Sequence, residues 1–182
     1  GSSFKPIVYA TAFERGLGPA TVLYDVPTKI GEDEPQNFDG KFLGPLTIRQ
    51  ALGASRNIPA AKAFFLAGGE ENVLSMAERL GVITPGLRRT EYKLTQPDFD
   101  YGWPLALGAG ETPLLEMVEA YSTFADGGIF RSVSAITRIT DRNGNILFEA
   151  QPDPTGQQVL DPRIAYQITS VLSDSSVRPG DF

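Results

Sequence analysis

The 182-residue sequence contains no histidine and no cysteine. Without histidine, the chain can build neither a Ser-His-Asp triad, nor a Cys-His dyad, nor a His-ligated metal site. Without cysteine, thiol catalysis, zinc ribbons, iron–sulfur clusters and disulfide bonds are excluded as well. Any catalysis must therefore use Ser, Thr, Tyr, Lys, Asp, Glu or Arg, and we expect neither a metal nor another cofactor.

The sequence also lacks long hydrophobic runs and an excess of positive charge. No run approaches the ~20 consecutive apolar residues that a membrane-spanning helix needs, and the apolar stretch 60–67 is interrupted by Lys62. The first residues do not have the basic and then apolar pattern of a signal peptide. A net charge of −6 argues against binding to the phosphate backbone of a nucleic acid. We therefore expect no nucleic-acid partner.

The residues that are present predict a folded, helix-rich chain. Hydrophobic residues make up 41% of the sequence, which is enough for a buried core. Apolar periodicity and capping residues predict helices over residues 7–13, 47–52, 60–67, 70–80, 112–125 and 161–172. Alternating residues around Asn143-Gly144 predict a β-hairpin over 134–148, followed by a polar linker over 151–158. The composition of 17–45 and 82–111 is typical of loops. The fold class expected is α+β, mainly helical, with one hairpin.

A Ser-x-x-Lys pair lies at the start of the chain, at Ser2 and Lys5. Residues three apart share one face of a helix, so the hydroxyl and the amine would lie within reach of each other. An amine whose pKa is lowered by burial can remove the proton of a serine hydroxyl. Ser-x-x-Lys is thus a way to form an acyl-enzyme without histidine, although this spacing also occurs often by chance.

A second polar group, Ser55-Arg56-Asn57, falls in the break between two expected helices. There Ser55 could relay a proton and Asn57 could bind an amide. Taken alone, the same residues are better explained as a helix cap, and this motif is weaker than Ser-x-x-Lys.

Together and in this order, the two motifs resemble the penicillin-recognising serine acyltransferases. The segment from Gly1 to Tyr9 resembles the nucleophile region of bifunctional, class A, high-molecular-mass penicillin-binding proteins. Further segments similar to that family follow in the same order, at residues 37–47, 55–60, 107–112 and 120–128. The resemblance extends over nearly the whole chain.

The resemblance implies a function and a role for each site residue. Ser2 would attack the carbonyl of a peptidoglycan stem peptide ending in D-Ala-D-Ala, and β-lactam antibiotics would acylate it. Lys5 would be the general base, Ser55 would relay the proton, and Asn57 would bind the substrate amide. The backbone N–H of Ser2 would form one arm of the oxyanion hole. The family also implies a membrane-anchored parent protein at the periplasmic or extracellular face of the bacterial cytoplasmic membrane.

Two departures from the family pattern qualify this assignment. Arg56 occupies a position where the motif has Asp in other members. No Lys-Thr-Gly or Lys-Ser-Gly motif follows Asn57, and the chain begins with Gly1 instead of Met. We therefore expect residues 1–182 to be a partial transpeptidase domain, without the strand that carries the third motif, the glycosyltransferase domain or the membrane anchor. Such a fragment would be inactive in turnover.

Other functions remain open at this point. A D,D-carboxypeptidase or a serine β-lactamase would share the fold and the first two motifs, with Glu111 as a superficial candidate for a deacylating glutamate. A non-catalytic binding or scaffold fragment is the alternative outside the enzymes. It would be favoured if Ser2, Lys5, Ser55 and Asn57 did not cluster.

Overall fold

The computed structural model describes residues 1–150 and 156–178. Its α-helices within these residues are α1 (Lys5–Glu14), α2 (Ile48–Gly53), α3 (Asn57–Leu66), α4 (Glu70–Arg79), α5 (Thr84–Lys93), α6 (Leu114–Ala125) and α7 (Pro162–Leu172). Short 3₁₀ helices are η1 (Ser2–Phe4), η2 (Trp103–Leu107) and η3 (Ser175–Val177). The strands are β1 (Val22–Asp25), β2 (Gly44–Thr47), β3 (Ile129–Phe130), β4 (Arg138–Thr140), β5 (Ile146–Glu149) and β6 (Gln157–Gln158).

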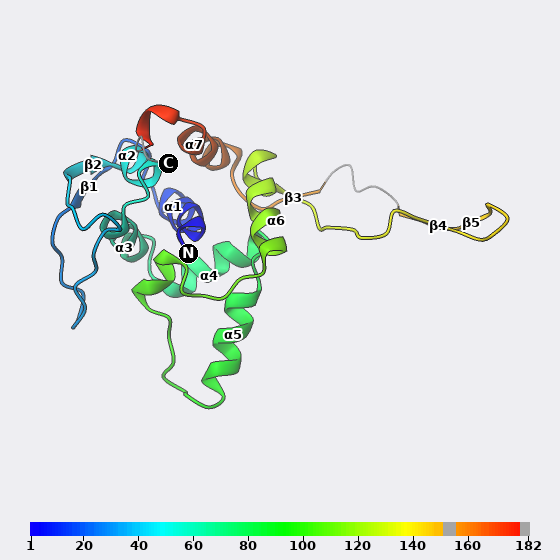
Figure 1. Ribbon diagram of the computed structural model, residues 1–182, viewed down its shortest axis with the longest axis horizontal. Coiled ribbons are helices and arrows are strands. Elements are labelled where there is room, and N and C mark those ends of the chain that lie inside the picture. The colour runs from blue at the N-terminus through cyan, green and yellow to red at the C-terminus, as the bar shows by residue number, and fades with distance from the viewer. Residues whose placement is uncertain (151–155, 179–182) are drawn as a thin grey trace.

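Helix α1 is the centre of the molecule, with the other helices arranged around it (Figure 1). It packs against α3, α4 and α7, and Ile7, Val8 and Tyr9 are fully buried. A helix that is apolar on every side is stable only when it is surrounded by protein. The 3₁₀ turn η1 precedes α1 directly, so the candidate nucleophile is attached to the central element of the fold.

The helix ends follow the capping residues in two of three cases. The Thr47 side chain and Gln50 form a reciprocal capping box at α2, and the Asp161 carboxylate caps α7. The expected cap at Thr112 is wrong, because the N-cap of α6 is Pro113. The Thr112 hydroxyl donates instead to the Gly110 carbonyl at 3.2 Å.

Helix α5 and the strands β1 and β2 lie wholly or partly in stretches for which the sequence predicts loops. Helix α5 occupies part of 82–111, and its first N–H is bound by the Glu116 carboxylate of α6 at 3.0 Å. Strands β1 and β2 pair antiparallel within and beside 17–45, with Leu23 opposite Leu46. The helix and the strand pair each depend on partners that are distant in the sequence.

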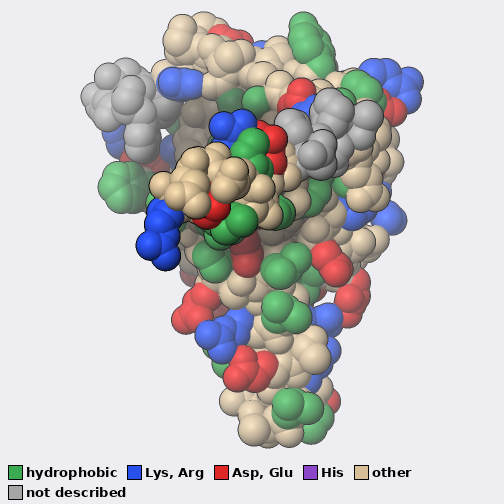
Figure 2. Space-filling view, turned by 90° about the vertical axis from the view of Figure 1, so that its right-hand side faces the viewer, with side chains coloured by type: hydrophobic (Ala, Val, Ile, Leu, Met, Phe, Trp, Pro, Cys, Tyr) green, Lys and Arg blue, Asp and Glu red, His purple; other side chains and the backbone are tan. Residues whose placement is uncertain are grey.

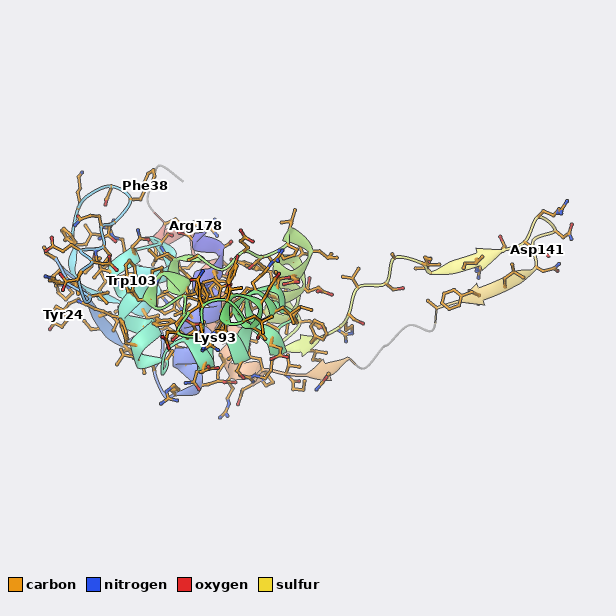
Figure 3. The ribbon with its side chains drawn as sticks, turned by 90° about the horizontal axis from the view of Figure 1, so that it is seen from below. Tyr24, Phe38, Lys93, Trp103, Asp141 and Arg178 are labelled. Carbon is orange, nitrogen blue, oxygen red and sulfur yellow. The ribbon has the colours of Figure 1, made fainter. Side chains whose placement is uncertain are left out.

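The expected β-hairpin is present as β4 and β5, and it projects away from the helical body (Figure 1). Asp141, at its turn, lies at the far tip in Figure 3. Its first strand is shorter than expected, because β4 begins only at Arg138, whereas β5 starts at Ile146 as expected. The polar linker expected over 151–158 lies partly outside the described residues, and its last two residues form β6, paired with β3.

Charge on the surface is mixed. Acidic and basic side chains alternate over the face that Figure 2 presents, and neither sign gathers into one large patch. Within the described residues, no helix has both the length and the apolar character needed to cross a membrane.

Candidate active site

The nucleophile candidate Ser2 lies at the start of η1, one 3₁₀ turn before Lys5. The Lys5 backbone N–H donates to the Ser2 carbonyl, and residues three apart in a 3₁₀ helix lie one above the other. The Ser2 side chain is exposed, and it makes no hydrogen bond within the described part of the chain. Ser2 is therefore open to a substrate, on the same face as the Lys5 side chain.

The turn that carries Ser2 is held by two elements from later in the sequence. The Tyr121 hydroxyl of α6 donates to the Ser3 carbonyl at 3.0 Å. The Gly1 nitrogen donates to the Gly108 carbonyl at 2.9 Å. Gly108 has a φ of +78°, and a Cβ at this position would lie 2.2 Å from the Gly1 nitrogen. Only glycine allows the two backbones to approach this closely.

Lys5 is the buried cation of the site. Its residue is 1% exposed, and its Nζ lies 2.6 Å from the Ser55 carbonyl, 2.7 Å from Asn57 Oδ1 and 3.2 Å from Ser55 Oγ. Burial, and secondarily the neighbouring Arg56 guanidinium, lower the pKa of the Lys5 ammonium from 10.5 to about 8. Close to neutral pH, a sizeable fraction of Lys5 is thus an amine that can accept a proton.

The three hydrogen-bond partners of Lys5 differ in whether they can only accept a hydrogen or can also donate one. The Ser55 carbonyl and Asn57 Oδ1 can only accept, so each takes a hydrogen from Nζ. The longer contact to Ser55 Oγ involves a hydroxyl, which can accept or donate. When Lys5 is neutral, its lone pair can therefore point to a serine hydroxyl while both short hydrogen bonds persist.

Ser55 and Asn57 are brought to Lys5 by the break between α2 and α3. Ser55 has a φ of +52°, the one positive φ of a non-glycine residue among the described residues. Such a conformation costs of order 1–3 kcal/mol and persists only when the surrounding structure enforces it. The reversed backbone directs both the carbonyl and the hydroxyl of Ser55 to the lysine. Asn57 begins α3 and fixes its amide by donating from Nδ2 to the Gln36 carbonyl at 2.8 Å.

Three of the four residues singled out in the sequence are thus joined by hydrogen bonds: Lys5, Ser55 and Asn57. Ser2 lies one turn before Lys5, but within the described residues its side chain is not hydrogen-bonded to these three. Asp25 and Asn37, which are buried and adjoin this group, are not marked as site residues by any motif of the sequence. The signal for Asn37 was its place in the polar turn Asn37-Phe38-Asp39-Gly40, in the stretch that resembles the family.

A small cavity adjoins the turn that carries Ser2. It has a volume of about 200 Å³, and its lining includes Gly1, Ser3 and Glu111. Ser2 and Lys5 are not part of that lining. Within the described residues, no group of three or more Asp and Glu side chains is arranged to hold a metal ion.

Comparison with known proteins assigns the family. Residues 1–181 match the penicillin binding protein transpeptidase domain. The chain belongs to this family. It is 34% identical to penicillin-binding protein 1A of Neisseria meningitidis serogroup B, over 96% of the chain and 21% of that protein. It is 35% identical to penicillin-binding protein 1A of Haemophilus influenzae, over 84% of the chain and 17% of that protein. The chain therefore spans about a fifth of the length of these relatives.

Solved structures confirm the fold expected for a penicillin-binding transpeptidase domain. Penicillin-binding protein 1A from Haemophilus influenzae superposes with a TM-score of 0.77 at 29% identity, over 94% of this chain and 29% of that one. PonA1 from Mycobacterium tuberculosis gives a TM-score of 0.83 at 27% identity, over 94% of this chain and 46% of that one. PonA1 in complex with penicillin V gives 0.81 at 26% identity, over 94% of this chain and 45% of that one. The α+β class with predominant helix is thus correct.

Proposed function

We propose that this chain carries the nucleophile and the proton-transfer groups of a D,D-transpeptidase, which cross-links peptidoglycan stem peptides that end in D-Ala-D-Ala. The observation that carries the proposal is the buried Lys5 amine, held by Ser55 and Asn57 one turn after an exposed serine. Membership of the transpeptidase family supports the reaction class, and the penicillin V complex of PonA1 supports β-lactams as ligands.

Acylation begins with proton transfer from the Ser2 hydroxyl to the neutral amine of Lys5. Ser2 Oγ then forms a bond to the carbonyl carbon of the penultimate D-Ala, and the carbonyl oxygen becomes an oxyanion. As the tetrahedral intermediate collapses, the C–N bond breaks. The terminal D-Ala leaves after its nitrogen receives a proton from the Ser55 hydroxyl, which is replenished from Lys5. The product is an ester on Ser2 and a free amino acid.

In the second half-reaction, the amino group of another stem peptide attacks the ester carbonyl and loses a proton to Lys5. The bond between the acyl carbon and Ser2 Oγ then breaks, and Lys5 returns the proton to Oγ, so that the free serine is restored. Asn57 would hold the peptide amide of the donor, because its amide group is fixed at the site by Gln36 and Lys5. A β-lactam would undergo only the first half-reaction, the acylation of Ser2. Its leaving nitrogen stays tethered within the opened ring, so the acyl-enzyme would persist.

The chain supplies only part of the machinery that this reaction requires. The backbone N–H of Ser2 would form one oxyanion donor, and the second donor and the carboxylate-binding groups would come from a strand with a Lys-Thr-Gly motif. We propose that residues 1–182 are part of a longer protein that also holds this strand, a glycosyltransferase domain and a membrane anchor. That protein would act at the periplasmic or extracellular face of the membrane. The loss of one oxyanion donor costs about 10²–10³ in rate, so the isolated chain would turn over little substrate.

Hydrolysis, as in a D,D-carboxypeptidase or a β-lactamase, is the weaker candidate. It needs a base that activates water next to the Ser2 ester. Glu111 lines the cavity beside Gly1 and Ser3, but Ser2 does not face that cavity. If Glu111 served as this base, Glu111→Gln would abolish steady-state hydrolysis of a chromogenic cephalosporin by the complete protein.

Labelled penicillin tests the proposal. We expect the complete protein to be labelled in a 1:1 ratio on the peptide that contains Ser2, and Ser2→Ala to be unlabelled while Ser3→Ala, the neighbouring exposed serine, is labelled normally. Rapid stoichiometric labelling of the isolated 182-residue chain would contradict the expected dependence on the third motif. Labelling of Ser2→Ala at the wild-type rate would refute the assignment of the nucleophile.

A further inference from the structure

Behind Lys5, Ser55 and Asn57 lies a buried ion pair that no step of the proposed reaction uses. Asp25, the last residue of β1, is fully buried, and the Arg56 residue is 6% exposed. Arg56 Nε donates to Asp25 Oδ2 at 2.9 Å. Burial of two charges contributes little net stability, because desolvation offsets their attraction. The pair therefore calls for an explanation other than stability alone.

Asn37 connects this ion pair to the active site. Its Nδ2 donates to Asp25 Oδ1 at 2.7 Å and to the Lys41 carbonyl at 2.8 Å. Its Oδ1 accepts the backbone N–H of Asn57 at 2.8 Å. Two donors on one side and an acceptor on the other are provided by an amide and not by a carboxylate. The position of Asp25 is thus transmitted through one side chain to the first residue of α3.

The loop 26–43 completes a clamp around the Ser55–Asn57 segment. Arg56 Nη1 donates to Asp39 Oδ2 at 3.0 Å, and Nη2 donates to the Lys41 carbonyl. The far part of the loop is attached to η2, where Trp103 Nε1 donates to Asp33 Oδ2 at 3.0 Å. In Figure 3 the labelled Phe38 marks the outer edge of this loop, at the end of the molecule opposite the projecting hairpin.

We propose that Asp25, Asn37 and Arg56 are positioning residues, which hold Ser55 and Asn57 in the geometry that receives the Lys5 amine. The inference rests on the proposed function and deepens it. It accounts for the positive φ of Ser55, because the two residues that follow Ser55 are anchored to the loop and to β1. It also gives Arg56, the middle residue of the Ser55–Asn57 segment, a definite role in this chain.

The charges around Lys5 make the role measurable. Arg56, at the start of α3, is the charged group whose field lowers the pKa of Lys5. Asp25 pairs with Arg56 Nε at 2.9 Å, and the charge that acts on the pKa of Lys5 is that of Arg56. Tyr9, one turn further along α1, is held neutral by burial and by the negative charge of Asp25, which both raise the pKa of its hydroxyl. Removal of the ion pair as a unit should therefore raise the pH at which Lys5 becomes neutral.

The test uses the complete protein and the rate constant of acylation by a fluorescent penicillin. Asn37→Asp keeps the acceptor for the Asn57 N–H but places a carboxylate oxygen against Asp25 and the Lys41 carbonyl. We expect at least a tenfold slower acylation, in proportion to the loss of a positioned proton-transfer group. Asn37→Ser adds no charge, and its acylation should also be slower than that of the wild type. This variant replaces Asn37→Asp in the test if Asn37→Asp does not fold.

The double variant Asp25→Asn/Arg56→Gln removes both charges without leaving either one alone in the interior. We expect the midpoint of its acylation pH profile to rise by about half a pH unit or more. The matched control is Arg49→Gln/Asp174→Asn, which neutralises another Arg–Asp pair, 3.0 Å apart and joining α2 to the segment after α7. Its rate and its pH profile should remain those of the wild type.

The outcomes separate the two proposals. If the Asn37 variants and the double variant fold and behave as the control does, the positioning role is refuted while the transpeptidase proposal stands. The positioning role is refuted in the same way if acylation falls only in proportion to the folded fraction, measured by circular dichroism. If the wild type itself is not labelled, or labels without Ser2, it is the proposed function that fails.

Discussion

The pKa of Lys5 makes a quantitative prediction for the rate of acylation. With a pKa of about 8 instead of 10.5, about one Lys5 in ten is neutral at pH 7, against roughly one in three thousand for an unperturbed lysine. Burial, together with the charge of Arg56, thus raises the population of the neutral amine by about 300-fold. Because only the neutral amine accepts the Ser2 proton, the rate should follow this population.

The assay is stopped-flow acylation of the complete protein by a fluorescent penicillin between pH 6 and pH 10.5, corrected with Ser2→Ala for hydrolysis of the reagent. We expect the rate constant to rise almost tenfold per pH unit below the pKa and to level off above about pH 8. A rate that is already constant from pH 6, or that continues to rise beyond pH 10, would refute the assignment of Lys5 as a base with a lowered pKa.

Three further predictions concern other residues of the site and the core. Gly108→Ala should slow acylation and destabilise the fold, because its Cβ would lie 2.2 Å from the Gly1 nitrogen. The measurements are the rate of penicillin labelling and the melting temperature. Wild-type values of both would contradict this prediction. Tyr9→Phe should leave the free energy of unfolding unchanged or raise it by up to about 1 kcal/mol, because the buried Tyr9 hydroxyl has no hydrogen-bond partner among the described residues. Urea unfolding measures this, and a decrease of more than about 1 kcal/mol would contradict the prediction. The lowered pKa of Lys5 means that the unfolded chain binds more protons between about pH 8 and pH 10.5, so the free energy of unfolding should gain about 3 kcal/mol over that interval relative to Lys5→Met. Parallel pH dependences of the two proteins would contradict that linkage.

The sequence was sufficient for elements whose signals are local. Residues 7–13 are mostly apolar and correctly predicted a helix, and the capping residues Thr47 and Asp161 correctly mark two helix starts. The Asn143-Gly144 turn likewise predicted the hairpin, and Gly144 has the positive φ, +85°, that such a turn requires.

Other elements depend on contacts that a linear reading does not contain. Pro85-Gly86 is typical of a loop, but Glu116 binds the first N–H of α5 and Pro85 lies in its first turn. Strand β2 contains Gly44 and Pro45, which usually interrupt strands, yet the strand pairs with β1 and Pro45 lies on its exposed side. In both cases a long-range partner outweighs the local preference.

Some residues of the candidate site could be predicted from local sequence motifs, and others could not. The Ser-x-x-Lys and Ser-x-Asn motifs indicated which side chains to consider, because their spacing and chemistry are visible in the sequence. The buried Asp25–Arg56 pair joins residues 31 positions apart, and nothing in the local sequence of Asp25 distinguishes it from a surface aspartate at a strand end. Its role depends on burial, which is a property of the folded chain.

The central claim is that Ser2 is the nucleophile and that Lys5 activates it. Mass spectrometry of the complete protein after brief exposure to penicillin at pH 8 tests this claim most directly, with wild type, Ser2→Ala and Lys5→Met compared. We predict one penicilloyl group on the Ser2 peptide of the wild type, none on Ser2→Ala, and strongly slowed labelling of a folded Lys5→Met. A penicilloyl group on another residue, or labelling of Lys5→Met at the wild-type rate, would contradict the account.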